Sequence, residues 1–189
     1  MTSSESMMSS ELHGSLAKRN ENAHDIRKAE LGSLQQYISF RVGEEEYGVD
    51  IMSVREIKAW SDTTMVPNTP EHMRGVLNLR GTIVPIFDTK CRFGMGQTET
   101  TAKNVIIIVQ VDERVIGLLV DAVSDILNVY ESEIRPLPKM DRAVDEEYLA
   151  GLITVEQRMV ALLDTQRLFS ERDVEEGYGA ASVAGFREG

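Results

Sequence analysis

The fold is decided by the stretch YISFRVGEEEYGVDIMSVREI at residues 37–57, because it recurs in altered form as IIIVQVDERVIGLLVDAVSDI at residues 106–126. In both copies a short apolar run leads through a charged turn into a second apolar run, which contains a glycine at position 48 or 117. Short β-branched runs bounded by polar turns are typical of β-hairpins. A repeat of this kind indicates a duplicated β unit.

The repeat continues beyond the two hairpins. GVL at 75–77 matches GLI at 151–153, and IVPIFDT at 83–89 matches MVALLDT at 159–165. We expect short helices after Asp88 and Asp164, because an aspartate there accepts hydrogen bonds from the first free N–H groups of a helix. The TPEH stretch at 69–72 is a further helix-start signal. Asp50 and Asp121 lie near strand ends and are expected to be solvated turn residues.

Several short strands per repeat, with no room for crossover helices, predict antiparallel barrels or sandwiches. Each unit of about seventy residues is small for an independent core, so we expect the two copies to pack as one body. This mainly β domain is predicted to span residues 35–170. The polar, Ser-rich residues 1–34 and the acidic, then Gly/Ala-rich residues 171–189 are predicted to be flexible tails.

Composition excludes several classes of protein. The 189 residues are 42% hydrophobic, which suffices for a core, but no apolar run approaches the roughly 18 residues needed to cross a bilayer. The formal net charge of −11 and the lack of a Lys/Arg cluster predict that nucleic acid is not a partner and that the chain is not inserted in a membrane. Cys91 is the only cysteine, which excludes an internal disulfide and is typical of a cytoplasmic protein.

The sequence lacks the common catalytic motifs, including G-x-S-x-G, a phosphate-binding glycine loop and H-E-x-x-H. His13 and His24 lie in the predicted tail and His72 stands alone, so we predict no metal site. Asp88 and Asp164 occupy equivalent places in the repeats, which favours a shared capping role over a catalytic carboxylate pair. We therefore predict a protein without enzymatic activity or cofactor; a small hydrolase that uses both aspartates is the alternative.

The most informative difference between the two repeats is at Arg80, because the second copy has a glutamate at the equivalent position. If this segment is a strand, Asn78 and Arg80 lie on the face opposite Leu79. Arg80 then points to solvent or to a partner, beside Gly81, which permits a close backbone approach. Arginine pairs well with carboxylates and is common at interface hot spots. An exposed, inert arginine is the alternative.

A second mixed surface is predicted at residues 54–57. If this segment is a strand, Val54 and Glu56 share one face, and Arg55 and Ile57 share the other. A face that combines an apolar group with an acid suits the margin of a protein–protein site. The alternative is that Val54 simply belongs to the core.

With these residues in view, the chain resembles the CheW family of bacterial chemotaxis coupling proteins over about residues 35–170. The matching segments are YGVDI at 47–51, VREI at 54–57, PNTP at 67–70, GVLNLRG at 75–81, IVPIFD at 83–88, VDAVSD at 120–125, IRP at 134–136 and YLAGL at 148–152. The most specific element is NLRG followed by IVPI. The combination is much more specific than any single motif.

The resemblance implies two small, five-stranded, SH3-like β-barrels packed together. It also implies a non-enzymatic adaptor that joins the histidine kinase CheA to methyl-accepting chemotaxis receptors. In the family, one barrel contacts the regulatory domain of the kinase, which is itself CheW-like, and the groove between the barrels takes the hairpin tip of the receptor. Such a protein is cytoplasmic, is recruited to membrane-bound receptor arrays, and can contact other CheW-like domains.

Carried over to this chain, the resemblance implies that Arg80 and Glu56 matter for signalling and are candidates to pair. The full set of kinase- or receptor-binding positions is Val54, Glu56, Gly75, Asn78, Leu79, Arg80, Gly81, Val105, Gly117 and Val123. Two alternatives stay open. One is a CheW-like module that serves another chemosensory pathway. The other is a β-barrel that binds nucleic acid, which the negative charge and the expected burial of Tyr37, Phe40, Phe87 and Phe93 disfavour.

Overall fold

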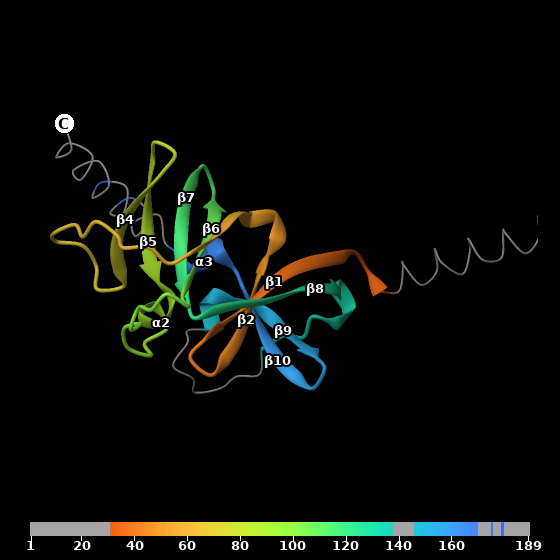
Figure 1. Ribbon diagram of the computed structural model, residues 1–189. Coiled ribbons are helices and arrows are strands. Elements are labelled where there is room, and N and C mark those ends of the chain that lie inside the picture. The colour runs from red at the N-terminus through yellow and green to blue at the C-terminus, as the bar shows by residue number, and fades with distance from the viewer. Residues whose placement is uncertain (1–30, 138–145, 170–174, 176–178, 180–189) are drawn as a thin grey trace, which may run out of the picture.

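The computed structural model describes residues 31–137, 146–169, 175 and 179 (Figure 1). The tails predicted at 1–34 and 171–189 therefore lie almost entirely outside the described residues, and β1 already begins at Leu34. Within the described part, no helix is long and apolar enough to span a membrane.

The described residues form two five-stranded sheets that lie side by side (Figure 1). The first sheet has the order β8-β1-β2-β10-β9, with β1 Leu34–Val42, β2 Glu45–Asp50, β8 Ala122–Tyr130, β9 Leu149–Val155 and β10 Arg158–Leu163. The second has the order β3-β6-β7-β5-β4, with β3 Val54–Ala59, β4 Met73–Leu79, β5 Thr82–Asp88, β6 Val105–Val111 and β7 Arg114–Val120. The short helices are η1 Ile51–Ser53, α2 Thr89–Arg92, η2 Glu131–Glu133, η3 Glu146–Tyr148 and α3 Thr165–Leu168. The predicted mainly β class is confirmed.

The two sheets do not follow the boundary between the two sequence repeats. The first sheet combines the hairpin β1–β2 of the first repeat with β8, β9 and β10 of the second, and the second sheet has the opposite combination. The predicted antiparallel pairing holds for most neighbours, but β10 pairs with β2, and β5 with β7, in parallel. Parallel neighbours need a long connection, and exchange between repeats supplies one without a crossover helix.

Three apolar clusters stabilise the fold, and one of them joins the two sheets. The main core lies between the sheets and includes Phe40, Tyr47 and Val49 from the first sheet and Phe87, Ile107 and Leu118 from the second. The first-sheet core includes Tyr37, Leu127, Ile153 and Leu162, and the second-sheet core includes Val84, Ile86, Ile106 and Ile108. Because side chains alternate along a strand, β1 and β10 of the first sheet and β5, β6 and β7 of the second each contribute to their own sheet's core and to the main core, whereas β2 contributes only to the main core. The two halves therefore pack as one body, as predicted.

Both predicted helix caps are present. The Asp88 carboxylate accepts a hydrogen bond from the Cys91 N–H at the start of α2. The Asp164 carboxylate accepts hydrogen bonds from the N–H groups of Gln166 and Arg167 at the start of α3. The capping role inferred from the repeat is thus confirmed at both aspartates.

Each capped helix delivers a phenylalanine to the opposite sheet. Phe93 follows α2 and packs on Tyr47 of the first sheet, with ring centroids 4.8 Å apart. Phe169 follows α3 and packs on Phe87 of the second sheet at 4.7 Å. Both phenylalanines are almost fully buried. The exchange of aromatic side chains mirrors the exchange of strands and locks the sheets to each other.

The helix predicted at 69–72 is wrong. The Met73 N–H donates to the Pro70 carbonyl in a single turn, and β4 begins at Met73. The Met73 side chain is buried in the main core, and its backbone pairs with Phe87 of β5. Strand pairing and burial therefore end the turn before a helix can extend.

Candidate functional site

Arg80 lies at the tip of the β4–β5 hairpin, so the predicted strand position of Arg80 is wrong. Arg80 and Gly81 have φ angles of 53° and 90°, so both central residues of the two-residue turn are left-handed, as in a type I′ turn. The Asn78 side-chain oxygen accepts a hydrogen bond of 2.8 Å from the Gly81 N–H and braces the turn. At this position the Arg80 side chain is 86% exposed to solvent.

Glu56 lies on β3, an edge strand of the second sheet. Val54 pairs with Val109 and Glu56 with Ile108, which leaves an extra residue on β3 and makes a β-bulge. Val54 and Glu56 are both half-buried, while Arg55 and Ile57 beside them on β3 are exposed. Val54 also packs against the main core, so it belongs to the mixed face and to the core at once. Bulges of this kind redirect side chains next to functional sites.

Glu56 and Arg80 meet as an ion pair. The Arg80 Nη2 and Glu56 Oε2 atoms are 3.4 Å apart, and the two side chains are 86% and 39% exposed. Glu56 lies on the edge strand β3 and Arg80 in the turn that follows the other edge strand, β4, so the pair links residues from opposite ends of the strand order of the second sheet. An exposed pair of this kind contributes only about 0–1 kcal/mol to stability. Its charged groups remain accessible to a partner.

Two of the predicted site positions lie inside the fold. Gly75 has a φ angle of 127°, and a Cβ atom there would collide with the Thr64 carbonyl oxygen. Gly117 is also buried, and a Cβ atom there would collide with the Ile86 side chain. Packing alone therefore explains the glycine at both positions, and neither contributes a side chain to the surface.

The remaining predicted positions are dispersed. Val105 begins β6 and Val123 lies in β8 of the first sheet, and both are half-buried against the main core. Leu79 packs against the second-sheet core, whereas Asn78 is exposed and holds the turn. Of the predicted residues, the structure thus brings together Glu56 and Arg80, with the turn that supports Arg80.

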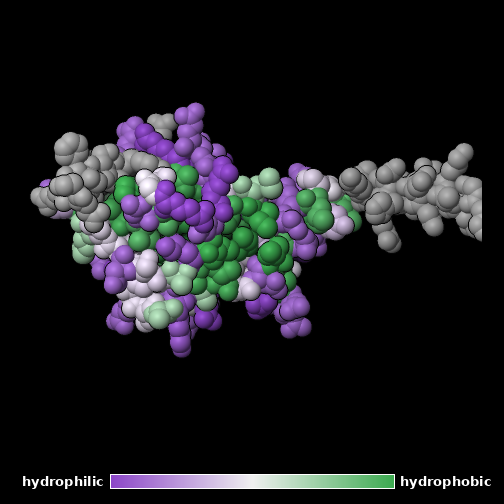
Figure 2. All heavy atoms as spheres, turned by 45° about the horizontal axis from the view of Figure 1, so that its top comes forward, coloured by the Kyte–Doolittle hydropathy of each residue, from purple (hydrophilic) through white to green (hydrophobic). Residues whose placement is uncertain are grey.

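Two exposed isoleucines, each directly after an acidic residue, were not identified as candidate site residues from the sequence. Ile57 follows Glu56 on β3, and Ile126 follows Asp125 at the equivalent place on β8. Their exposed fractions are 42% and 52%. Figure 2 shows a continuous apolar area on one face of the molecule, bordered by hydrophilic residues. The alignment of the two repeats, which pairs Ile57 with Ile126, was the signal available in the sequence.

Asp88 is fully buried and its carboxylate is fully engaged. Besides the cap on α2, it accepts hydrogen bonds of 2.8 Å from the Thr98 N–H and 2.7 Å from the Thr98 hydroxyl. Arg74 lies 3.9 Å from it and donates to the Thr98 carbonyl. This cluster fastens the loop after α2 to the second sheet, which is a structural role.

We predict that Asp88→Ala lowers the free energy of unfolding by about 3 kcal/mol, because it leaves buried donors without an acceptor. The matched control is Asp164→Ala, which removes the equivalent but half-exposed cap and costs about 1 kcal/mol. Urea unfolding monitored by circular dichroism measures both. Equal losses at the two positions would show that the buried Thr98 contacts contribute nothing beyond capping.

Cys91 sits in α2 beside this cluster. Burial raises the pKa of the Cys91 thiol, and the charges of Asp88 and Glu71 raise that pKa further, against the opposing effect of Arg74. Because the thiolate is the reactive form, a raised pKa means less thiolate at any given pH. We predict slower alkylation of the folded protein than of the urea-unfolded chain at pH 8, with a rate that rises at higher pH than for an unperturbed thiol. Iodoacetamide labelling followed by mass spectrometry measures this, and equal rates in both states would refute it.

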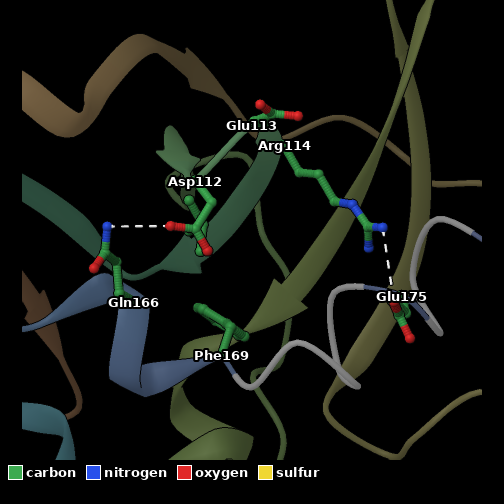
Figure 3. A pocket seen from close by; sticks show the side chains of 7 residues that line it. Asp112, Glu113, Arg114, Gln166, Phe169 and Glu175 are labelled. Carbon is green, nitrogen blue, oxygen red and sulfur yellow. Dashed lines mark hydrogen bonds and ion pairs between the residues drawn. The ribbon is translucent and has the colours of Figure 1, made fainter.

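A cavity of about 310 Å³ lies at the tip of the β6–β7 hairpin (Figure 3). It is lined by Val111, Asp112, Glu113, Arg114, Gln166, Phe169 and Glu175. Gln166 donates to Asp112 at 3.4 Å, and Arg114 lies 3.9 Å from Glu175. The described lining residues supply carboxylates, one guanidinium and one amide to this cavity. In the described part of the chain, no cluster of three or more His, Cys, Asp or Glu side chains could hold a metal ion.

Comparison with known proteins supplies the family. The CheW-like domain matches residues 36–173. The probable chemotaxis protein CheW of Rhizobium etli is 44% identical over 141 residues, which cover 75% of this chain and 91% of the relative. The chemotaxis protein CheW of Klebsiella aerogenes is 39% identical over 140 residues, covering 74% of this chain and 84% of the relative.

The structural comparison agrees. The crystal structure of the scaffolding protein TtCheW from Thermoanaerobacter tengcongensis superimposes with a TM-score of 0.68 at 32% sequence identity. The match covers 75% of this chain and 92% of that protein. These matches favour the scaffold over the hydrolase and the nucleic-acid binder. The chain therefore belongs to the CheW family, and it is a chemotaxis scaffold and adaptor protein rather than an enzyme.

Proposed function

We propose that this protein couples the histidine kinase CheA to methyl-accepting chemotaxis receptors. In this proposal it is cytoplasmic and is recruited to receptor arrays at the membrane. The observation that carries the proposal is the exposed Glu56–Arg80 pair, raised on a bulge and a hairpin tip. Such a pair adds little to stability, so its charges are free to engage a partner.

The shared core supports a coupling role. An adaptor must hold two partners in a fixed relation, and the main core joins both sheets into one body. A partner on one sheet is then kept close to a partner on the other, because both sheets belong to one body. Coupling between them is a free energy that depends on which receptor state each contact favours.

The proposed binding residues fall into two groups. Glu56, Asn78, Arg80 and Gly81 lie at or near the surface around the ion pair, where they can contact a partner directly. The other members are half-buried or buried, so they would act by shaping the surface: Val54, Gly75, Leu79, Val105, Gly117 and Val123. Direct contacts with other CheW-like domains are a further expectation.

Reconstitution tests the proposal. The purified chain is combined with CheA and with receptor-containing vesicles from the same organism, and ATP turnover by the kinase is measured with and without the chain. We expect stimulation only when all three components are present, and co-sedimentation of the chain with the vesicles. A folded chain that binds neither kinase nor receptor would overturn the proposal. If the chain stimulates only a kinase from a different chemosensory system and not CheA, the result would favour the alternative that the chain serves another chemosensory pathway.

A further inference from the structure

Within the described residues, the chain passes between the two sheets at two places. The first is η1, which leads from β2 of the first sheet to β3 of the second. The second is Asp121, the one residue between β7 of the second sheet and β8 of the first. Because this crossover is only one residue long, the hydrogen bonds of that residue constrain the relative orientation of the two sheets.

The Asp121 carboxylate has one oxygen on each side of this crossover. Oδ2 accepts a hydrogen bond of 2.6 Å from the Gly43 N–H in the β1–β2 turn of the first sheet. Oδ1 lies 3.4 Å from the Asn104 side-chain amide, directly before β6 of the second sheet. The Asp121 N–H also donates to the Arg41 carbonyl at 3.0 Å. Asp121 is half-buried, so the expectation of a merely solvated turn residue is wrong.

Asn104 is a firm anchor for this contact. Its side chain is buried, and its amide also donates to the Val120 carbonyl at the end of β7 at 3.3 Å. Its side-chain oxygen accepts hydrogen bonds from the N–H and the hydroxyl of Thr101 at 2.7 and 3.0 Å. These hydrogen bonds fix the position of the Asn104 side chain independently of its contact with Asp121.

In the part of the chain that the structure describes, the other crossover has no side-chain hydrogen bond that links the two sheets. Asp50 accepts a hydrogen bond of 2.8 Å from the Met52 N–H, and the Ser53 hydroxyl donates to the Asp50 carbonyl at 2.7 Å. These contacts all lie within the crossover itself. Met52 occupies the place equivalent to Asp121 in the repeat, and its side chain is 84% exposed. The carboxylate link between sheets is therefore particular to the second crossover.

We propose that Asp121 is a positioning residue that sets the orientation of the two sheets. Apolar burial in the main core is non-directional, whereas hydrogen bonds are directional and fix an angle. Any partner surface that uses both sheets then depends on Asp121 without touching it. Only the consequence for kinase coupling rests on the proposed function; the geometric claim does not.

The geometric test compares Asp121→Ala with Asp50→Ala, which removes a local contact at the other crossover. Both are made in a Cys91→Ser background with spin labels at the exposed residues Thr82 of β5 and Thr154 of β9, and the distance distribution is measured by pulsed electron paramagnetic resonance. We expect Asp121→Ala to shift or broaden the distribution and Asp50→Ala to leave it unchanged. Identical distributions in both variants would overturn the proposal.

The functional test uses the same variants, without labels, in the reconstituted kinase assay at a temperature where each is folded. We expect Asp121→Ala to weaken kinase stimulation about fivefold, and Asp50→Ala to leave it near the wild-type level. Asp121→Asn should recover part of the loss, because its amide oxygen still accepts from Gly43. If Asp121→Ala does not fold, Asn104→Ala cuts the same link from the other side. Equal activity of all variants contradicts the role in coupling, whereas an inactive wild type contradicts only the proposed function.

Discussion

Replacing Arg80 with glutamate is expected to reduce kinase stimulation by about tenfold or more in the reconstituted assay, because loss of an interface hot spot typically costs 2 kcal/mol or above. The substitution also places a like charge next to Glu56 of β3. The fold should survive, since an exposed ion pair contributes about 1 kcal/mol at most. Circular dichroism and the Tm establish that the variant is folded.

Arg158→Glu is the matched control for this experiment. Arg158 is exposed, it follows the turn of the equivalent hairpin on the first sheet, and it pairs with Glu46 at 3.0 Å. Its reversal should leave kinase stimulation within about twofold of the wild type, as for charges outside a binding site. Comparable losses for both arginines would point to net charge and contradict the proposed site.

The double variant Glu56→Arg/Arg80→Glu separates two ways in which the pair can act. It restores an ion pair of opposite polarity. If the pair only closes the edges of the sheet, the exchange should recover most of the activity. If a partner recognises the individual charges, as we expect, the double variant stays inactive. Full recovery would reduce the pair to a structural role.

Gly75→Ala is expected to lower the free energy of unfolding by about 3 kcal/mol. The new Cβ would collide with the Thr64 carbonyl oxygen, a backbone atom held by the Thr64–Val76 bridge. The φ angle of 127° adds strain, because side-chain-bearing residues rarely adopt it. Urea unfolding measures the change.

Gly81→Ala isolates the contribution of the backbone angle. Gly81 has a φ angle of 90°, but a Cβ there meets no atom within 4 Å. We expect a loss of about 1 kcal/mol at this position. If Gly75→Ala lowers the free energy of unfolding no more than Gly81→Ala does, the β3–β4 connection can move to accommodate the new methyl group. That result would contradict tight packing of Gly75 against Thr64.

Much of the local structure follows from the sequence. The paired hairpins, the helices capped by Asp88 and Asp164 and the burial of Phe40 and Phe87 were all predictable, because turns, caps and apolar alternation depend on residues a few positions apart. The resemblance that rested on NLRG and IVPI also pointed to the right family. The TPEH stretch shows the limit, since the burial of Met73 overrides a local helix signal.

The sequence by itself determined that this protein is a doubled β unit and that Arg80 is exposed, because both depend on a short-range pattern or a visible repeat. Only the tertiary structure decided that the repeats exchange hairpins, that Gly75 is enclosed and that Glu56 lies 3.4 Å from Arg80. These features join residues far apart in the chain. Their partners are selected by the burial of whole strand faces in common cores, which no local stretch of sequence encodes.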